Sequence, residues 1–213
     1  MKTLLFILLL VPVAAIAQPL SDSETAALIA RIAASRAGRT VQADFVESKT
    51  LPMWKSPVVE AGTIAFEPPN RFLRKTKNLV VCDGTTLWMY YPEFQQAERY
   101  PLGGRGPGQI FAALGQALRF ENLDEMFRVT ATRLPDGFRI DLLPKSGLLR
   151  RVVRSLQIEL DSSLRLRSSL LTGKEGDVAE TKYSNEQQLP LGSVRFSFDP
   201  PASATVVAPF GEK

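Results

Sequence analysis

The 213-residue sequence contains no histidine and a single cysteine, Cys82. Without histidine, Ser-His-Asp and Cys-His catalytic systems are excluded, and the most common protein ligand of zinc is missing. One cysteine cannot form an intramolecular disulfide, and it leaves no cluster for zinc or an iron–sulfur centre. We therefore expect no metal and no other cofactor. Cys82 follows three apolar residues and precedes a turn, which favours a small buried side chain over a reactive thiol.

Carboxylate pairs are the remaining candidates for catalysis. They are Asp22 with Glu24 at a helix start, Asp124 with Glu125 on a short polar helix, and Asp161 in a turn. Each position has an ordinary structural explanation, and no pattern predicts the burial that would shift a catalytic pKa. We expect a binding protein and not an enzyme. An enzyme of lipid or glycan processing is the hypothesis that a carboxylate essential for turnover would revive.

The one long apolar run lies at the N-terminus. Residues 1–17 combine a positively charged start, an apolar run that contains Pro12, and the small-residue cleavage pattern Ala15-Ile16-Ala17. This is the form of a signal peptide, with cleavage before Gln18. A membrane anchor is the alternative, but the run is shorter than the ~20 residues that a span needs. No cysteine follows the cleavage site for lipid attachment, so we expect a soluble periplasmic domain over residues 18–213.

The basic charge is spread along the chain. The formal net charge is +4 and the sequence pI is about 9.3. Basic residues gather at Arg71-Arg74-Lys75-Lys77 and at Arg150-Arg151-Arg154. An exported protein rarely meets nucleic acid, so we expect no nucleic-acid partner. A mildly basic surface with affinity for anionic lipid headgroups fits better.

Two amphipathic segments predict helices. Ser21–Gly38 has capping residues at its start and an apolar stripe that includes Leu28 and Ile32. Gln109–Leu118 follows the glycine-rich residues 103–108, which are predicted to form a hinge. We expect these two helices to form a lid, with contacts made by Leu28, Ile32, Ile110, Phe111 and Leu114.

The rest of the chain alternates with the period of two that is typical of strands. Tight turns separate the strands, and Asp83-Gly84 gives the strongest hairpin signal, because both residues suit positive φ. A long antiparallel meander curls towards a barrel. Two helices are too few to cover a flat sheet of this size. The predicted fold class is therefore mainly β with a few helices (α+β): an unclosed antiparallel β-barrel of about eleven strands with a helical lid.

The stretch from Gly62 to Leu102 is predicted to form one wall of a hydrophobic pocket, because large apolar and aromatic residues alternate along it. With the strand before it and one cation, the predicted cavity residues are Val41, Phe45, Ile64, Phe66, Phe72, Arg74, Trp88 and Tyr90. An ordinary filled core is the alternative, since aromatic residues at period two are common in cores. The export signal and the half-covered architecture favour a cavity.

The chain resembles the periplasmic lipoprotein carrier family LolA. The resemblance is strongest at VQADFVESK (Val41–Lys49), EAGTIAFEPPNRF (Glu60–Phe72) and VCDGTTLWMYYPEFQQAERYPL (Val81–Leu102), and the run Phe196–Pro201 resembles the family's C-terminal end. The segment DG-x-x-LW-x-Y-x-P is the most specific piece. The resemblance implies an unclosed barrel with a helical lid over a hydrophobic cavity. It also implies a carrier that takes lipoprotein acyl chains from an inner-membrane exporter to an outer-membrane acceptor.

Two positions depart from the family's pattern. The family has an arginine before the Pro-Asn turn, where it tethers the lid, and this chain has Pro68. The following strand usually reads Phe-x-Trp, and here it reads Phe72-Leu73-Arg74. These differences suit a lid that is held differently, or a ligand that is an anionic lipid or a lipid-linked product. Arg74 could instead extend to the cavity rim.

The sequence supports two functional hypotheses. The first is a monomeric periplasmic carrier that shields acyl chains of lipoproteins, or another lipid-linked ligand, during transfer towards the outer membrane. The second is a periplasmic sensor or protein-interaction module built on the same half-barrel, with a filled interior and a protein partner.

Overall fold

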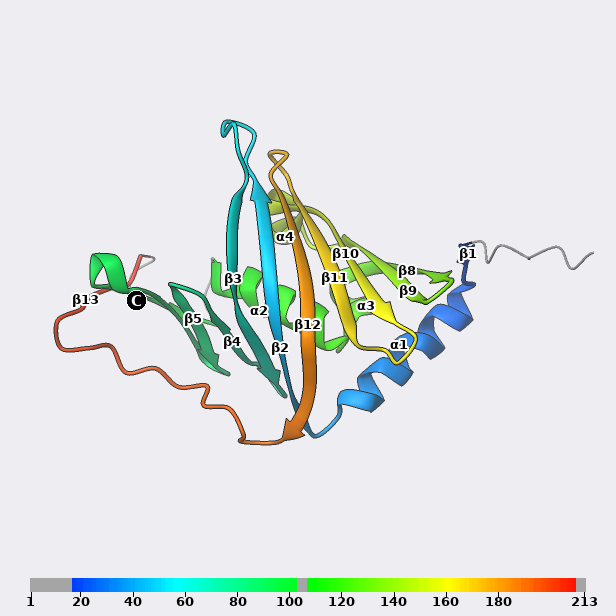
Figure 1. The fold of residues 1–213 in the computed structure, drawn as a ribbon, viewed down its shortest axis with the longest axis horizontal. Helices are drawn as coiled ribbons and strands as arrows, with labels where there is room; N and C mark the ends of the chain where they lie inside the picture. Colours follow the sequence, from blue (N-terminus) through cyan, green and yellow to red (C-terminus); the bar gives the residue numbers. More distant parts are fainter. Residues whose placement is uncertain (1–16, 103–106, 210–213) are drawn as a thin grey trace, which may run out of the picture.

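The computed structural model describes residues 17–102 and 107–209. Almost all of the predicted signal peptide, and part of the predicted glycine-rich hinge, therefore lie outside the described residues. The described chain forms a single sheet that curves without closing (Figure 1). This confirms the predicted unclosed, mainly β fold.

The sheet is organised about the pairing of two long strands from opposite ends of the chain. β2 and β12 lie side by side near its middle, although about 140 residues separate Phe45 from its partner Tyr183. The strand order is β1-β8-β9-β10-β11-β12-β2-β3-β4-β5-β6-β7-β13. The bounds are β1 (Gln18–Pro19), β2 (Arg39–Thr50), β3 (Val58–Glu67), β4 (Arg71–Lys75), β5 (Leu79–Asp83), β6 (Thr86–Tyr91), β7 (Gln96–Pro101), β8 (Phe127–Leu134), β9 (Gly137–Pro144), β10 (Val153–Asp161), β11 (Leu166–Gly173), β12 (Val178–Pro190) and β13 (Thr205–Val207).

The described chain has 13 strands, where the sequence predicts about eleven. Two short edge strands account for much of the difference: β1 pairs with β8, and β13 pairs with β7 in parallel. The strand predicted at Val194–Phe198 is wrong, because this stretch forms no ladder. Val194 and Phe196 alternate as strand residues do, but they belong to an extended C-terminal segment, residues 191–209, that leaves the sheet after Pro190.

Four α-helices are described: α1 (Asp22–Arg36), α2 (Pro107–Arg119), α3 (Leu123–Met126) and α4 (Gly147–Val152). Ser21 begins α1 with a capping box, in which its Oγ accepts from the Glu24 amide and Glu24 accepts from the Ser21 amide. A short 3₁₀ turn, η1 (Pro92–Phe94), follows β6. α2 crosses behind the central strands in Figure 1, as expected for a lid helix. α4 was not predicted from the sequence.

One main apolar core joins both long helices to the concave face of the sheet. Leu28 and Ile32 of α1, Ala113 and Ala117 of α2, and Ile158 of β10 belong to this cluster. A smaller cluster around Val80, Cys82, Leu87 and Tyr100 lies under β5 to β7. Cys82 is 4% exposed, so the predicted burial is confirmed, and burial raises the pKa of its thiol.

Candidate ligand cavity

A cavity of about 430 Å³ lies between the concave face of the sheet and α2. Its volume falls in the range of about 300–1,000 Å³ that is typical of small-molecule sites. The lining is largely apolar and comes from both halves of the sheet and from the lid helix. The apolar residues are Phe45, Ile64, Phe72, Val80, Met89, Leu114, Leu118, Leu156, Leu171 and Ala179.

One wall of the cavity carries an ion-pair cluster. Arg74 Nη2 lies 2.9 Å from Glu47 Oε1 and 3.3 Å from Glu60 Oε2, and all three residues line the cavity. The Arg74 guanidinium carbon lies 4.8 Å from the centroid of the Phe45 ring. The Arg74 side chain is 21% exposed. Two carboxylates and an aromatic face therefore compensate its partial desolvation. Arg74 lines the cavity and is held there by the two carboxylates.

Hydroxyl groups extend this polar wall onto β11 and β12. Thr181 Oγ1 donates to Glu47 Oε2 over 3.2 Å, and the Tyr183 hydroxyl lies 3.0 Å from Ser169 Oγ. Burial raises the pKa of Tyr183, so its phenol stays neutral at physiological pH. The cavity thus has an apolar floor and a wall of paired charges and neutral hydroxyls. This combination suits a molecule with an apolar chain and a polar head.

The C-terminal end of α2 is fixed to the sheet by Arg119. Arg119 Nη2 donates to the Pro69 carbonyl over 2.9 Å and to Asn70 Oδ1 over 3.3 Å, and its Nε pairs with Glu121. Pro68 cannot supply a side-chain donor at this turn. The donor comes instead from the lid helix, and the backbone of the β3–β4 turn accepts. The lid helix therefore supplies the donor and the turn supplies the acceptor, which reverses the hydrogen bond that the family resemblance implies at position 68.

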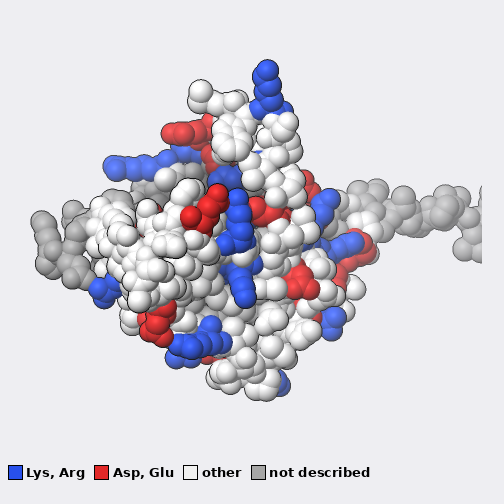
Figure 2. Space-filling model, turned by 60° about the vertical axis from the view of Figure 1, so that its left-hand side comes forward, with Lys and Arg blue, Asp and Glu red and all other residues white. Residues whose placement is uncertain are grey.

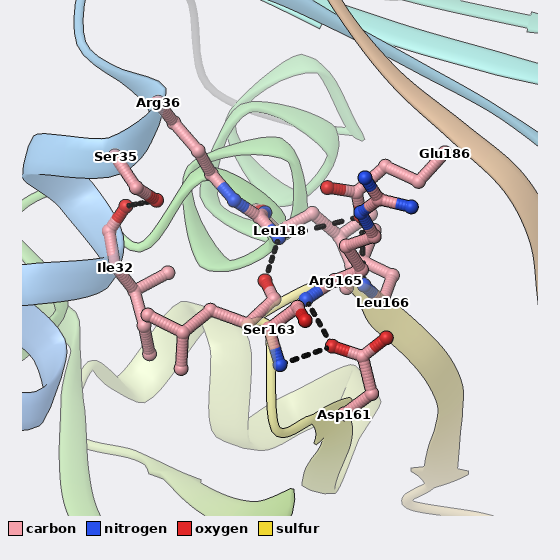
Figure 3. Close-up of polar contacts among 10 residues, drawn as sticks. Ile32, Ser35, Arg36, Leu118, Asp161, Ser163, Arg165, Leu166 and Glu186 are labelled. Atoms are coloured by element: carbon pink, nitrogen blue, oxygen red, sulfur yellow. Dashed lines mark hydrogen bonds and ion pairs between the residues drawn. The ribbon is translucent and has the colours of Figure 1, made fainter.

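A second buried arginine, Arg36, contacts the same end of α2 (Figure 3). Arg36, at the end of α1, donates to the Leu118 carbonyl over 2.7 Å and to the Leu164 carbonyl over 3.2 Å. Its Nη2 also lies 3.5 Å from Glu186 Oε2. Burial lowers the pKa of Arg36 and Glu186 opposes that shift, but an arginine remains charged. α1, α2 and β12 meet at this guanidinium.

Glu67, at the end of β3, connects the sheet to the C-terminal segment. Its side chain is 2% exposed and accepts hydrogen bonds from the Gly192 amide, the Thr40 hydroxyl and Arg71. Burial alone would raise the pKa of Glu67, but these three donors outweigh it and hold the pKa below its ordinary value. Sequence reasoning missed this residue, because Gly192 lies 125 positions further along the chain.

Five of the predicted site residues come together around the cavity: Phe45, Ile64, Phe72, Arg74 and Leu114. Val41 and Phe66 share their strand faces but lie deeper, in the filled core, each 1% exposed. The remaining predicted lid residues pack in or against that core, with Leu28 and Ile32 buried and Ile110 partly buried. Phe111 lies in α2, but its side chain is outside the described residues.

Trp88 and Tyr90 do not line the cavity and lie on the opposite face of β6. Their rings contact Phe198 of the C-terminal segment, with centroid distances of 5.8 Å and 5.2 Å. Leu87 and Met89 occupy the inner face in their place. The strand TLWMYY is apolar on both faces, so its pattern could not decide which set points inward.

The sequence reasoning also missed cavity residues that the far half of the sheet contributes. Leu156 on β10, Leu171 on β11 and Tyr183 on β12 face the same space as Phe45. Their period-two pattern identifies strands, but it does not reveal that β12 lies next to β2. The pairing of distant strands was the missing information.

Over residues 17–102 and 107–209, no group of three or more His, Cys, Asp or Glu side chains is placed to hold a metal ion. Within the same residues, no helix is long and apolar enough to cross a membrane.

Comparisons with known proteins agree with this geometry. The family model described as outer membrane lipoprotein carrier protein LolA matches residues 36–207. An outer-membrane lipoprotein carrier protein from Dechloromonas aromatica is 27% identical over 177 residues, which is 79% of this chain and 81% of that protein. One from Bordetella avium is 25% identical over 209 residues, covering 94% and 93%. A solved structure of an uncharacterised Thermus thermophilus protein has a similar fold, with a TM-score of 0.51, 15% identity, and coverage of 86% and 98%.

Proposed function

The chain belongs to the family of outer membrane lipoprotein carrier proteins, LolA, and we propose that it is a periplasmic carrier for acyl chains. In this proposal it shields the chains of lipoproteins, or of another lipid-linked ligand, on the way towards the outer membrane. The observation that carries the proposal is the cavity of about 430 Å³ under α2. A filled interior would have favoured a sensor or a protein-interaction module.

The driving force for such a carrier is apolar burial. Each exposed CH₂ group costs ~0.8 kcal/mol in water, so an acyl chain cannot cross an aqueous space without cover. The floor formed by Leu114, Leu118 and Leu156 supplies that cover. The Arg74 cluster would lie against the polar end of the ligand. The carrier binds and releases its cargo and makes no chemical change to it.

Cargo entry and release require α2 to move. The cavity has the volume of a small-molecule site, so a cargo with several acyl chains needs α2 to swing away from the sheet. The contact between Arg119 and the Pro69 carbonyl would open, while Arg36 keeps the end of α2 near the core. Movement about the end held by Arg36 opens the cavity without unfolding the sheet.

The proposed route has an inner-membrane exporter as donor and an outer-membrane receptor as acceptor. The carrier acts as a soluble monomer in the periplasm after signal-peptide cleavage. Each encounter loads or empties the same cavity, and net transfer requires the acceptor to bind the cargo with higher affinity than the carrier does.

Mass spectrometry of protein purified from membrane extracts tests the proposal. We expect a bound molecule with at least one acyl chain, in substantial yield. Leu118→Trp fills the cavity and should abolish co-purification. Leu191→Trp is the matched control, because Leu191 is 55% exposed and lies outside the cavity. Lipid-free protein, or equal lipid in both variants, would overturn the carrier assignment.

A further inference from the structure

One end of the half-barrel exposes apolar side chains in an arrangement that the cavity does not use. At the tip of the β2–β3 hairpin, Met53 is 94% exposed and Trp54 is 59% exposed. Lys55 follows them and is also exposed. The hairpin projects beyond the rest of the sheet, at the top of Figure 1. Nothing in the described fold covers these side chains.

α4 presents a similar mixture nearby. Leu149 anchors the helix in the core, whereas Leu148 and Val152 are 37% and 43% exposed. Arg150 and Arg151 stand between them and are exposed, and they begin the Arg150-Arg151-Arg154 cluster noted in the sequence. The short helix thus displays alternating apolar and basic side chains.

The β11–β12 turn joins these two surfaces into one. The Lys174 amide donates to the Val152 carbonyl over 2.9 Å, and Arg154 donates to the Lys174 carbonyl over 3.4 Å. On the other side of the turn, a Cβ added at Gly176 would lie 3.8 Å from Pro52 Cγ. α4, the turn and the β2–β3 tip are therefore neighbours. We call this surface the docking end, defined by Met53, Trp54, Lys55, Arg150, Val152 and Lys174.

The exposed charge at the docking end is mainly basic. Arg150, Arg151, Arg154, Lys55 and Lys174 are exposed there, and the acidic residues of the β11–β12 turn are Glu175, which is exposed, and Asp177, which is half-buried. Figure 2 shows this end as a projection with a basic side chain at its tip and white side chains beneath it. Lysine and arginine near a surface of anionic lipid each contribute about 1 kcal/mol of attraction. Tryptophan prefers the interface between headgroups and acyl chains.

We propose that the docking end binds the surface of a bilayer that contains anionic phospholipid. Trp54 and Met53 insert at the headgroup level, and the surrounding basic side chains contact the lipid phosphates. A protein interface would need a contiguous apolar centre with a polar rim. Here single apolar side chains stand among cations instead, which fits insertion between headgroups.

The docking end also orients the cavity. Lys49 and Asp177 line the cavity and lie close to the β2–β3 and β11–β12 turns. A protein docked through these turns directs this side of the cavity towards the lipid. The inference concerns where the protein sits and not what it carries, so it does not depend on the identity of the cargo.

Vesicle flotation tests the proposal with the full mature chain. We expect flotation with vesicles of phosphatidylcholine and phosphatidylglycerol, and much less with phosphatidylcholine alone. Met53→Ser with Trp54→Ser, and separately Lys55→Glu with Lys174→Glu, should each reduce partitioning by about tenfold or more. Matched controls are Phe94→Ser, at a position 72% exposed, and Arg39→Glu with Lys182→Glu, at exposed positions away from this end. These controls should float as the unaltered protein does.

Tryptophan fluorescence gives a second readout, because the chain has two tryptophans. In a Trp88→Phe background the emission reports Trp54 alone, and we expect a blue shift on adding the anionic vesicles. Equal flotation of the tip variants and their controls, or an unshifted Trp54, would overturn the proposal. So would saturable binding of a protein partner without vesicle binding. Leu118→Trp should still float, so loss of cargo and loss of docking are separable.

Discussion

The two halves of the concave face have the same strand pattern but different interiors. In the half near α1, the concave face is filled, with Ile32, Ile140 and Ile158 each 0% exposed. In the half near α2, strands β2 to β6 and β10 to β12 line the cavity, and an ion-pair cluster replaces part of the apolar packing. The same alternation of apolar residues therefore yields a core in one half and a container in the other.

Helix attachment makes the difference. α1 presses Leu28 and Ile32 directly into the sheet, where they become part of the core. α2 is attached at its C-terminal end through Arg36 and Arg119, and its Leu114 and Leu118 border an open space. α2 also packs Ala113 and Ala117 into the core, but Leu114 and Leu118 beside them border the cavity, so open space remains next to this helix.

The open half recovers some apolar burial on its outer face. Trp88 and Tyr90 turn away from the cavity and pack against Phe198 of the C-terminal segment. Phe196 of the same segment is 6% exposed. Aromatic contacts of this kind contribute about 0.5–1.5 kcal/mol beyond the area that they bury. The half that holds the cavity is thus supported from outside.

The largest expected effect separates the two arginines at the end of α2. Arg36→Met should cost about 3–5 kcal/mol of unfolding free energy, because it leaves Glu186 buried without its charge partner. Arg119→Met should cost about 1–2 kcal/mol, because its partner Glu121 is 34% exposed. Denaturant unfolding measures both. Equal losses would contradict the idea that the different burial of Glu186 and Glu121 sets the cost of removing each arginine.

Arg119→Met should differ from Arg36→Met in a second respect. Its loss frees α2 from the β3–β4 turn, so amide hydrogen exchange in α2 should quicken while the strands stay protected. Unchanged exchange in α2 would show that Arg119 does not hold the lid.

The next prediction compares an apolar truncation in the filled core with one at the cavity wall. Ile158→Ala should cost about 2–5 kcal/mol, because the residue is 0% exposed and its neighbours cannot collapse freely. Leu171→Ala should cost about 1 kcal/mol, because that side chain is only partly buried and already borders empty space. Chemical denaturation of each variant makes the comparison. A larger loss at Leu171 would mean that the cavity is packed in solution.

A smaller effect is expected on the outer face. A double-mutant cycle between Trp88→Ala and Phe198→Ala should give a coupling of about 0.5–1.5 kcal/mol. Leu191→Ala, in the exposed start of the same segment, provides the control and should not couple to Trp88. Zero coupling between Trp88 and Phe198 would show that the C-terminal segment does not stabilise the outer face of β6 through this contact.

The smallest effect concerns acid. The folded pKa of Glu67 lies below its unfolded value of about 4.3. Its stabilisation is therefore present above that value and is lost as the pH falls through the folded pKa. Glu67→Gln should lower stability at neutral pH and flatten its decline between about pH 5 and the folded pKa. Parallel acid curves for the variant and the unaltered protein would contradict this.

Local pattern predicted the parts of the fold that depend on neighbours in sequence. The N-cap at Ser21, the lid helix after the glycine-rich residues and the inner faces of β2 and β3 are local, and all were predictable. The face of Trp88 was not, because both faces of its strand are apolar. The contact between Arg119 and Pro69 joins residues 50 positions apart, and no periodicity signals it. Contacts between residues far apart in sequence determine these parts of the site, and local periodicity does not predict them.

The two ends of the described chain cover the two edges of the sheet. An open sheet exposes unpaired backbone groups along both edges, and such edges invite other strands to add. Here β1 covers the outer edge of β8, and β13 covers the outer edge of β7. Both are very short, and Pro19 removes a backbone donor from one of them. A chain shortened at either end should therefore be more prone to aggregate, even where its cavity and lid remain intact.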